Sequence, residues 1–574
     1  MMYFFLTLNK NGDVGYFPAG EKDRLPPGIC CLKRPLPLGL IQNAQDWTNK
    51  RKKGRFWGSG LKERQCDRVK SELCRLLNGQ EWNVPKLSSQ EDFVTSDCQL
   101  ASSIDGRELM FQAFDELVLG RQLSWGELKI LARELRCEAE IILAFAHLNV
   151  ERNMAEWVPA VVPQGKGWQC QRCGERNIKE WPSYYGRAGT CLSCKTLGPS
   201  TSLEAFYRDH RPLLKGQENV NFYPHWPLTE AQNLASGQVL AFLNNSAQPK
   251  ALLWAACGSG KTEVCFPSAA RALEEGKSVL FAAPRQDVIH DVAPRLKRDF
   301  PGVPIQVLTG SVPIRYQRGN LVLATTHQVL RFWQAFDVIF LDEMDAFPYQ
   351  GSEALEWGLT HALRPKGKLI YLTATPSLEA LKEVRRGNML LIRLPARHHR
   401  YPLPIPVVEK YRNPFDPKSN LLSLNKARFE SIRQAGRILV FVPKISWIQP
   451  WVNCFRRYFP DWKIEGSYSS DKERFDKISD LRQGKFDLFV STTILERGIT
   501  LEGIQVVVLG AEHPIFDERA LVQMAGRVGR TRENPSGTIV FMSCSNSTAM
   551  KTAIQWIKDQ NRLALKQGLI DLRT

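Results

Sequence analysis

Short apolar runs alternate with stretches of helical spacing from about residue 250 to the C-terminus. This alternation is typical of parallel sheets whose strands are joined by crossover helices. The proline-rich segment 400–406 separates two such series, so the pattern predicts two α/β lobes, at residues 215–395 and 405–574. The predicted strands begin at Leu252, Ser278, Leu321, Val338 and Leu369 in the first lobe and at Arg437, Phe486, Val506 and Thr538 in the second.

The N-terminal region, residues 1–155, has a different pattern. Its first eight residues are apolar, lack a basic start and precede a turn signal, so they predict a strand and hairpin and not a signal peptide. The apolar residues have helical spacing between residues 109 and 150, where Ser124 and Glu127 are expected to form a capping box. We therefore expect an α-rich region with a small helical docking module.

Two further segments are less regular. The basic and aromatic segment 50–57 is typical of a contact to phosphates and stacked bases, and equally of a solvated loop. Residues 200–227 are expected to be a linker that ends in aromatic side chains.

Composition narrows the class of partner. The chain has 574 residues and a formal net charge of +18 at pH 7. This excess favours nucleic acid first and a membrane surface second, although a basic surface without a specific partner has the same composition. No apolar run is long enough to span a membrane. The 14 cysteines are too sparse for a disulfide scaffold, so we expect a protein of the reducing cytoplasm.

Four cysteines form two CxxC pairs, and 17 residues separate the pairs. This spacing is typical of a four-thiolate zinc site, which leaves no open coordination position and is therefore structural. Paired disulfides or unrelated thiols are the alternative. We predict a zinc module at residues 165–200, whose basic and aromatic side chains suggest a nucleic-acid contact. The predicted ligands are Cys170, Cys173, Cys191 and Cys194.

A glycine-rich turn follows the first strand of the first lobe and precedes a predicted helix at residues 263–276. This context predicts a phosphate-binding loop, in which the backbone N–H groups face the phosphates. Lys261 is expected to reach the β- and γ-phosphates and Thr262 to bind Mg²⁺. The first position is alanine instead of the usual glycine, and a chance glycine-lysine turn is the alternative. The loop comprises Ala255, Ala256, Cys257, Gly258, Ser259, Gly260, Lys261 and Thr262.

A second apolar run ends in the acidic sequence Asp342-Glu343-Met344-Asp345. Beside a phosphate-binding loop, Asp342 is expected to hold Mg²⁺ and Glu343 to orient and deprotonate the attacking water. A solvated acidic turn is the alternative. A glutamine ahead of the loop, Gln232, follows the predicted helix cap Thr229 and could recognise the adenine edge of ATP.

Polar side chains follow several predicted strands, and ligands of parallel sheets gather at the carboxyl ends of strands. Thr373 and Thr375 could relay the nucleotide state to a bound strand. The predicted nucleic-acid contacts are Pro284, Arg285, Thr325 and Thr326 in the first lobe and Pro443, Thr492 and Thr493 in the second.

The second lobe has no phosphate-binding loop but contains the sequence QMAGRVGR. Arg527 and Arg530 lie three residues apart, on one face of a predicted helix start, and could reach the γ-phosphate as arginine fingers. A basic surface loop is the alternative.

These motifs, in order between Leu228 and Phe541, resemble those of superfamily 2 helicases and translocases: AACGSGKT, DEMD, TAT, STTILERG and QMAGRVGR. The resemblance implies two RecA-like lobes with ATP between them and a nucleic-acid strand across the top. Many members have alanine at the position of Ala255. The resemblance also implies that Gln523, Arg527 and Arg530 close the ATP site and that Gly498 contacts ATP.

A zinc module ahead of the motor, together with the sequences DEMDAFPY and ERGITL, is similar to the ComFA family of bacterial late-competence proteins. The resemblance implies a cytoplasmic, membrane-associated motor that draws single-stranded DNA inward, with an inner-membrane channel and competence proteins as partners. Primosomal helicases have a similar motor, but their zinc cysteines lie within the second lobe.

The expected function is an ATP-dependent single-stranded DNA translocase with ATP, Mg²⁺ and Zn²⁺ as cofactors. The alternatives are a primosomal-type DNA helicase, an RNA-dependent ATPase of the same fold, a nucleotide-gated DNA clamp, and a structural zinc-containing nucleic-acid-binding protein with an inactive ATP site.

Overall fold

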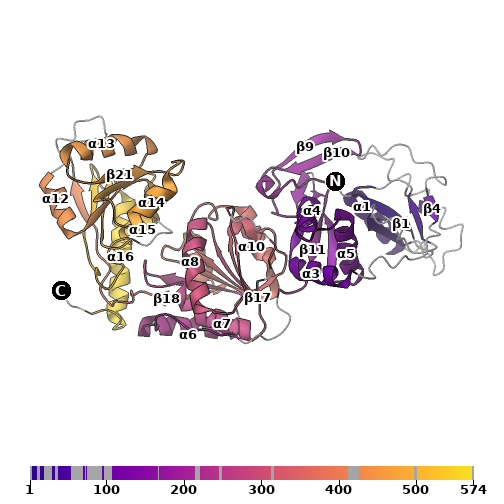
Figure 1. The fold of residues 1–574 in the computed structure, drawn as a ribbon, viewed down its shortest axis with the longest axis horizontal. Helices are drawn as coiled ribbons and strands as arrows, with labels where there is room; N and C mark the ends of the chain where they lie inside the picture. Colours follow the sequence, from indigo (N-terminus) through magenta and orange to yellow (C-terminus); the bar gives the residue numbers. More distant parts are fainter. Residues whose placement is uncertain are drawn as a thin grey trace.

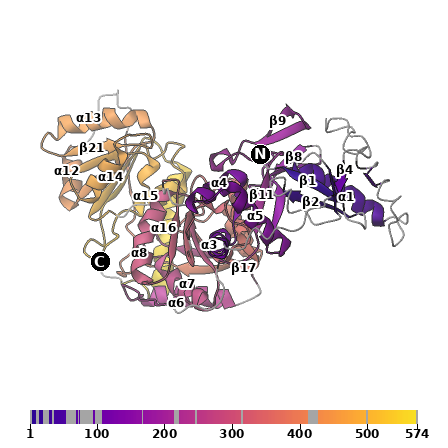
Figure 2. The ribbon, with the colours of Figure 1, turned by 45° about the vertical axis from the view of Figure 1, so that its right-hand side comes forward.

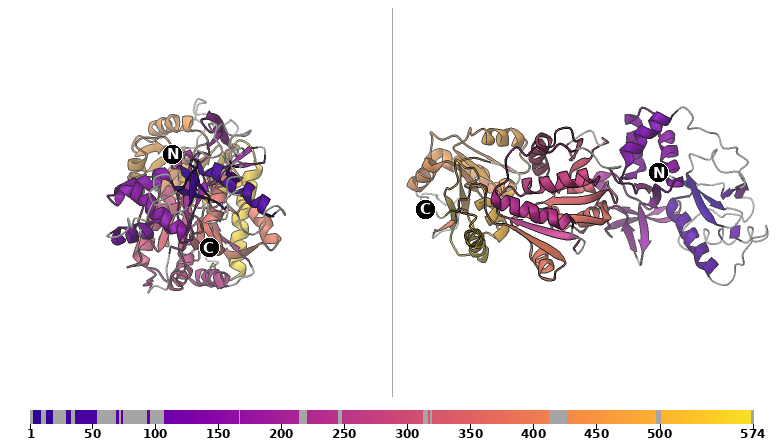
Figure 3. Two further views of the ribbon diagram at one scale, coloured as in Figure 1. Left: turned by 90° about the vertical axis from the view of Figure 1, so that its right-hand side faces the viewer. Right: turned by 90° about the horizontal axis from the view of Figure 1, so that it is seen from below.

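The computed structural model has three parts in a row: the N-terminal region with the cysteine module, lobe 1 and lobe 2 (Figure 1; Figure 3, right). None of the helices in the described part of the chain is long and apolar enough to cross a membrane. The predicted residues Gly498 and 54–57 lie outside that part. The structure describes residues 3–8, 13–18, 29–32, 36–53, 69–70, 73, 93–95, 107–165, 167–213, 220–244, 248–311, 316–317, 319–411, 426–496 and 501–571.

The predicted N-terminal hairpin is present. Strands β1 (Phe4–Leu8) and β2 (Val14–Pro18) pair antiparallel, and β3 (Cys30–Leu32) and β4 (Phe93–Thr95) extend the sheet in the order β2-β1-β3-β4. Helix α1 (Leu38–Lys53) follows β3.

The predicted helical stretch forms α3 (Glu108–Val118), α4 (Trp125–Glu134) and α5 (Ala139–Glu151). Ser124 caps α4, and the capping box with Glu127 is complete. A three-stranded antiparallel sheet accompanies the helices, in the order β5 (Gln122–Ser124), β11 (Ala205–Asp209), β6 (Ala155–Pro159). The linker interpretation of residues 200–227 is therefore wrong for β11, whose residues are all buried in the N-terminal region.

Two hairpins carry the four predicted zinc ligands. They are β7 (Val161–Gln164) with β8 (Gly167–Cys170), and β9 (Ile178–Ser183) with β10 (Gly186–Cys191).

Lobe 1 confirms the predicted parallel sheet. Its seven strands run in the order β14-β15-β13-β16-β17-β12-β18. Side chains alternate between two cores: Leu253 and Phe281 face one, and Leu252 and Leu280 face the other. The strands are β12 (Lys250–Ala255), β13 (Val279–Ala283), β14 (Ile305–Leu308), β15 (Leu321–Thr325), β16 (Phe336–Asp342), β17 (Leu363–Thr373) and β18 (Met389–Leu394), of which β14 and β18 were not predicted.

The helices of lobe 1 cover both faces of this sheet. They are α6 (Glu230–Asn244), α7 (Phe266–Glu274), α8 (Gln286–Asp299), α9 (Thr326–Val329), α10 (Glu353–Ala362) and α11 (Leu378–Arg385).

Lobe 2 has a second parallel sheet, in the order β19-β24-β23-β20-β22-β21. The strands are β19 (Val407–Lys410), β20 (Arg437–Phe441), β21 (Ile464–Ser467), β22 (Leu488–Ser491), β23 (Ile504–Leu509) and β24 (Ile539–Ser543). The helices are α12 (Lys426–Ala435), α13 (Ile448–Tyr458), α14 (Arg474–Arg482), α15 (Glu518–Ala525) and α16 (Thr548–Lys566).

Helix α16 links the lobes. Its first turns belong to the core of lobe 2 through Met550 and Ile557. The end of the chain instead packs into lobe 1, where Ala564, Leu569 and Ile570 join the core around α6 and α7. The helix accordingly runs from lobe 2 down beside lobe 1 (Figures 1 and 2).

Candidate functional site

The glycine-rich turn lies between β12 and a short 3₁₀ turn, Glu263–Cys265, that leads into α7. Gly258 and Gly260 have φ values of +76° and +77°, a left-handed backbone that favours glycine. A Cβ at Gly260 would lie 2.6 Å from the Gln232 amide nitrogen. These glycines therefore allow the tight turn that a phosphate-binding loop requires.

Asp342, at the end of β16, contacts both predicted phosphate-loop ligands. Its Oδ1 lies 3.1 Å from Lys261 Nζ, and its Oδ2 accepts a hydrogen bond from Thr262 Oγ1 at 3.1 Å. Neighbouring oxygen ligands of an octahedral Mg²⁺ are about 2.9 Å apart, so the Thr262 and Asp342 oxygens fit this ion. Burial alone would lower the pKa of Lys261, but the Asp342 and Glu343 carboxylates outweigh it and raise that pKa.

Glu343 is held in an unusual backbone conformation. Its φ is +54°, and its N–H donates to Leu372 O at 3.0 Å and Asp342 Oδ1 at 2.8 Å. The side chain is 8% exposed, and within the described residues no group donates a hydrogen bond to its buried Oε2. A buried carboxylate oxygen in this position can accept a hydrogen bond from a water molecule, as a general base would.

Lobe 2 faces this group across a cleft of about 1340 Å³. Gln523, Arg527 and Arg530 line the cleft together with Lys261 and Glu343. The structure corrects one expectation, because α15 ends at Ala525 and both arginines follow the end of a helix instead of starting one. Gly526 forms the C-terminal cap of α15.

Both arginines are held by backbone carbonyls. Arg527 Nε donates to Glu496 O and Arg530 Nε to Gly526 O, each at 3.0 Å. Burial and the mutual repulsion of the two guanidinium groups lower the pKa of Arg527, and burial lowers that of Arg530. A buried Arg527 and a partly buried Arg530 that face a phosphate loop favour an anion between the lobes.

A hydrogen-bonded chain crosses the cleft. Asp345 accepts from the hydroxyls of Thr373 at 2.5 Å and Thr375 at 2.6 Å. Gln523 Nε2 in turn donates to Thr375 Oγ1 at 3.1 Å. The acidic sequence after β16 is thereby connected to α15 of lobe 2.

Gln232 lies against the glycine-rich loop. Its Oε1 accepts from Thr229 N at 2.9 Å, and its Nε2 donates to Ser259 O at 2.8 Å. Recognition of adenine by this amide stays a prediction. The aromatic side chains Trp226 and Tyr401 also line the cleft; sequence reasoning missed them, although the aromatic run 222–226 was a visible signal.

The predicted nucleic-acid contacts do lie at strand ends, but most of their side chains are buried. Thr326 is 0% exposed and Thr492 is 8% exposed. Pro284, Thr325 and Pro443 are also buried, whereas Arg285 and Thr493 are partly exposed. Arg285 forms an ion pair with Glu496 of lobe 2 at 3.6 Å. The contacts themselves stay a prediction.

The four predicted zinc ligands form one buried cluster. All four Sγ atoms lie within 4.8 Å of one another, and the Cys173–Cys191 and Cys170–Cys194 separations are 3.6 and 3.7 Å. Tetrahedral Zn–S bonds of about 2.3 Å place sulfurs about 3.8 Å apart, whereas a disulfide requires about 2.05 Å. The cluster could therefore hold a zinc ion.

The cysteine module packs directly on lobe 1. Its cysteines share a hydrophobic core with Leu330 and Leu355 of that lobe. Gly174, in the first knuckle, has a φ of +73°, and a Cβ there would lie 2.4 Å from the Trp357 ring.

Comparison with known proteins agrees with this architecture. Residues 225–378 match the family "Type III restriction enzyme, res subunit" and residues 420–532 match "Helicase conserved C-terminal domain". Competence protein ComFA of Bacillus subtilis is 35% identical over 413 residues, which cover 70% of this chain and 88% of that protein. The chain belongs to the ComFA family.

A second relative, competence protein ComFA of Streptococcus pneumoniae, is 34% identical over 72% of this chain and 95% of its own length. The domain matches imply a helicase-like, nucleic-acid-dependent ATPase that uses ATP and Mg²⁺. Among solved structures, Mycobacterium smegmatis helicase Lhr bound to ssDNA and AMP-PNP is similar at a TM-score of 0.45 and 17% identity, over 59% of this chain and 51% of that one. RecG bound to a three-way DNA junction is similar at 0.43 and 16%, over 61% and 47%.

Proposed function

We propose that this ComFA-family chain is an ATP-dependent single-stranded DNA translocase that drives DNA uptake during natural transformation. One observation carries the proposal: the predicted catalytic side chains of both lobes line a single cleft, and Gln523 connects them through Thr375 to Asp345. ATP bound there would contact both lobes, so its hydrolysis would change how they are held together.

Each residue has a proposed role in hydrolysis. Lys261 would bind the β- and γ-phosphates, while Thr262 and Asp342 would hold the Mg²⁺ ion that neutralises their charge. Glu343 would take a proton from the attacking water. Arg527 and Arg530 would stabilise the charge that develops on the γ-phosphate.

Movement along DNA would follow from closing and opening the cleft. Each lobe would grip the phosphate backbone alternately, without reading bases. The net charge of +18 supports a polyanionic track. The strand-end residues, with Arg285 and Thr493 the most accessible, would supply part of the contact.

We further propose that Cys170, Cys173, Cys191 and Cys194 hold a structural zinc ion, because their spacing and burial suit it. The names of the relatives support a role in competence, and we propose that the chain acts at the cytoplasmic face of the inner membrane, beside a DNA-uptake channel and other competence proteins. Pull-down with residues 1–150 deleted tests whether the N-terminal region binds these partners, and unchanged partner recovery would contradict a docking role for that region.

The central experiment measures ATP hydrolysis without polymer and with single-stranded DNA, duplex DNA or single-stranded RNA. We expect strong stimulation by single-stranded DNA that is lost in Lys261→Ala. Equal stimulation by RNA would instead identify an RNA-dependent ATPase. Stimulated hydrolysis without displacement of a protein block from the DNA would identify a clamp.

A further inference from the structure

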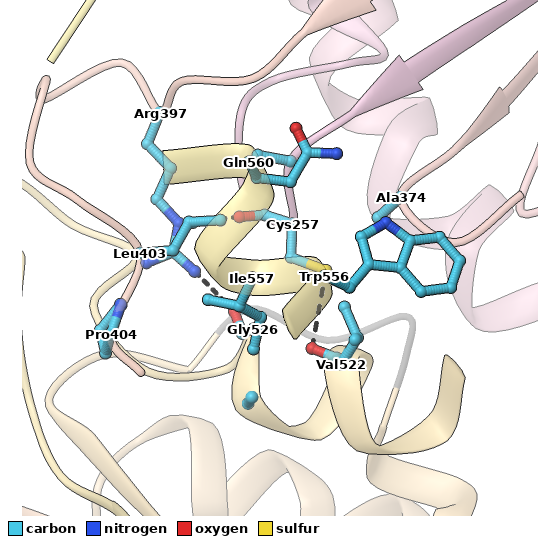
Figure 4. A pocket seen from close by; sticks show the side chains of 12 residues that line it. Cys257, Ala374, Arg397, Leu403, Pro404, Val522, Gly526, Trp556, Ile557 and Gln560 are labelled. Carbon is cyan, nitrogen blue, oxygen red and sulfur yellow. Dashed lines mark hydrogen bonds between the residues drawn. The ribbon is translucent and has the colours of Figure 1, made fainter. Parts of the chain in front are cut away.

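A buried arginine outside every recognised motif connects the phosphate-binding loop to the turn that carries Arg527 and Arg530. Arg397 lies just after β18, at the start of the segment between the lobes, and is 2% exposed. Figure 4 shows its side chain pointing toward Gly526 beside Cys257.

The Arg397 guanidinium group donates to carbonyls from both lobes. Nε donates to Cys257 O of the phosphate-binding loop at 2.7 Å. Nη1 donates to Val528 O at 2.6 Å and also to Gly529 O. Nη2 donates to Gly526 O at 3.1 Å. One rigid fork therefore fixes the loop and the arginine-bearing turn relative to each other.

The acceptors explain why an arginine is suitable here. The turn follows the C-terminal end of α15, where helix carbonyls lack intrahelical donors and a cation is favourable. Only the planar guanidinium group, with five N–H donors, can serve three carbonyls of this turn and one of the phosphate-binding loop at once. Burial and the nearby Arg530 lower the pKa of Arg397 to about 9, so the group stays charged at neutral pH.

The phosphate-binding loop and the turn that carries Arg527 and Arg530 also lie close together beside Arg397. A Cβ at Gly526 would lie 2.4 Å from the Cys257 Cβ, so the loop and the turn touch at this point. A second residue of the same segment, His399, contacts Gly529 O through Nε2 at 3.0 Å.

We propose that Arg397 is a positioning residue for ATP hydrolysis: it sets the distance between the phosphate-binding loop and the two arginines of lobe 2. It does not touch the reacting atoms. The inference rests on the proposed roles of Arg527 and Arg530, because it acts through the turn that carries them.

The test replaces Arg397 with methionine, which keeps most of the volume but no donors, and with lysine, which keeps the charge. For both variants we expect kcat with single-stranded DNA to fall about 10- to 100-fold. The Kd of a fluorescent ATP analogue should change less than about threefold, because Lys261 and the glycine-rich loop remain. If the methionine variant does not fold, the lysine variant carries the same test.

Arg393→Met is the matched control, because this arginine lies four residues earlier and packs 3.9 Å over the Trp254 ring, away from the turn. Its kcat should stay within about twofold of wild type. A double mutant separates positioning from general damage: the loss in Arg397→Met with Arg530→Met should be smaller than the product of the two single losses, because both substitutions act through Arg530.

Three results would overturn the proposal. They are an Arg397→Met kcat within twofold of wild type, a double mutant whose loss is the product of the single losses, and full activity of both Arg527→Met and Arg530→Met. In the third case the arginine-finger role fails too, whereas stimulation of the wild type by DNA would still support the translocase.

Discussion

Gln523 of lobe 2 donates its side-chain amide to the hydroxyl of Thr375 of lobe 1 at 3.1 Å. Thr375 in turn donates to Asp345 at 2.6 Å. Two hydrogen bonds thus join α15 to the acidic sequence that ends β16, and all three side chains are buried. A buried polar chain of this kind is sensitive to the loss of any one member.

Thr375→Val therefore should uncouple the lobes. Valine preserves the shape but leaves Asp345 and Gln523 each without one hydrogen-bond partner, at a cost of about 1–3 kcal/mol. We expect DNA-stimulated kcat to fall about tenfold while nucleotide affinity changes little. Steady-state hydrolysis and nucleotide titration measure both, with the exposed Thr360→Val as control. Unchanged stimulation by DNA would show that the hydrogen bonds from Gln523 through Thr375 to Asp345 do not transmit the nucleotide state between the lobes.

The sequence predicted the parts of the site that are local. The glycine-rich loop, the acidic strand end and the CxxC pairs each require a fixed spacing of a few residues, and all are found where they were expected. Arg397 was missed because its four acceptors lie about 130 to 140 residues away. The prediction that a helix starts at Arg527 was wrong, because the helix before it ends at Ala525 and Gly526 caps its C-terminus.

Glu127 also shows that local contacts can be predicted from sequence whereas distant contacts cannot. Ser124 and Glu127 were predicted as a local pair, which they are. Glu127, 4% exposed, also accepts from Arg172 in the first cysteine knuckle at 3.3 Å and pairs with Arg331 of lobe 1. One carboxylate therefore holds the N-terminal region, the cysteine module and lobe 1 together.

Glu127→Gln should loosen that three-way contact. Removing one charge from a buried ion pair leaves its partners uncompensated and costs about 3–5 kcal/mol. We expect a lower melting temperature and faster proteolysis between residues 107 and 213, measured on the full chain. Glu140→Gln, on the exposed face of α5, is the control. Equal stability of the two variants would mean that Glu127 serves only as a helix cap.

Zinc removal gives a further prediction. The chain should contain one zinc ion, measured by metal analysis, and Cys173→Ser should lose it because three thiolates bind more weakly than four. The module shares its core with Leu330 and Leu355 of lobe 1, so metal loss should also destabilise that lobe. Cys137→Ser changes a half-buried thiol outside the cluster and should retain the ion. A metal-free wild type with the same melting temperature would contradict a structural zinc.

The last prediction concerns α16, which begins on lobe 2 and ends on lobe 1. Leu569, 6% exposed, belongs to the lobe 1 core, and Arg400 pairs with Asp571 beside it at 3.2 Å. Leu569→Ala would remove apolar contact at the point where the helix is anchored, at a cost of about 2–5 kcal/mol if the surroundings do not relax. The expected result is a wider distribution of distances between the lobes, measured by energy transfer between labels on α8 and α13. Leu565→Ala, which is 41% exposed on the same helix, should leave the distribution unchanged. If both variants behave like wild type, α16 does not restrain the lobes, and other contacts between them, such as those of Arg285, Arg397 and Gln523, hold the cleft in this arrangement.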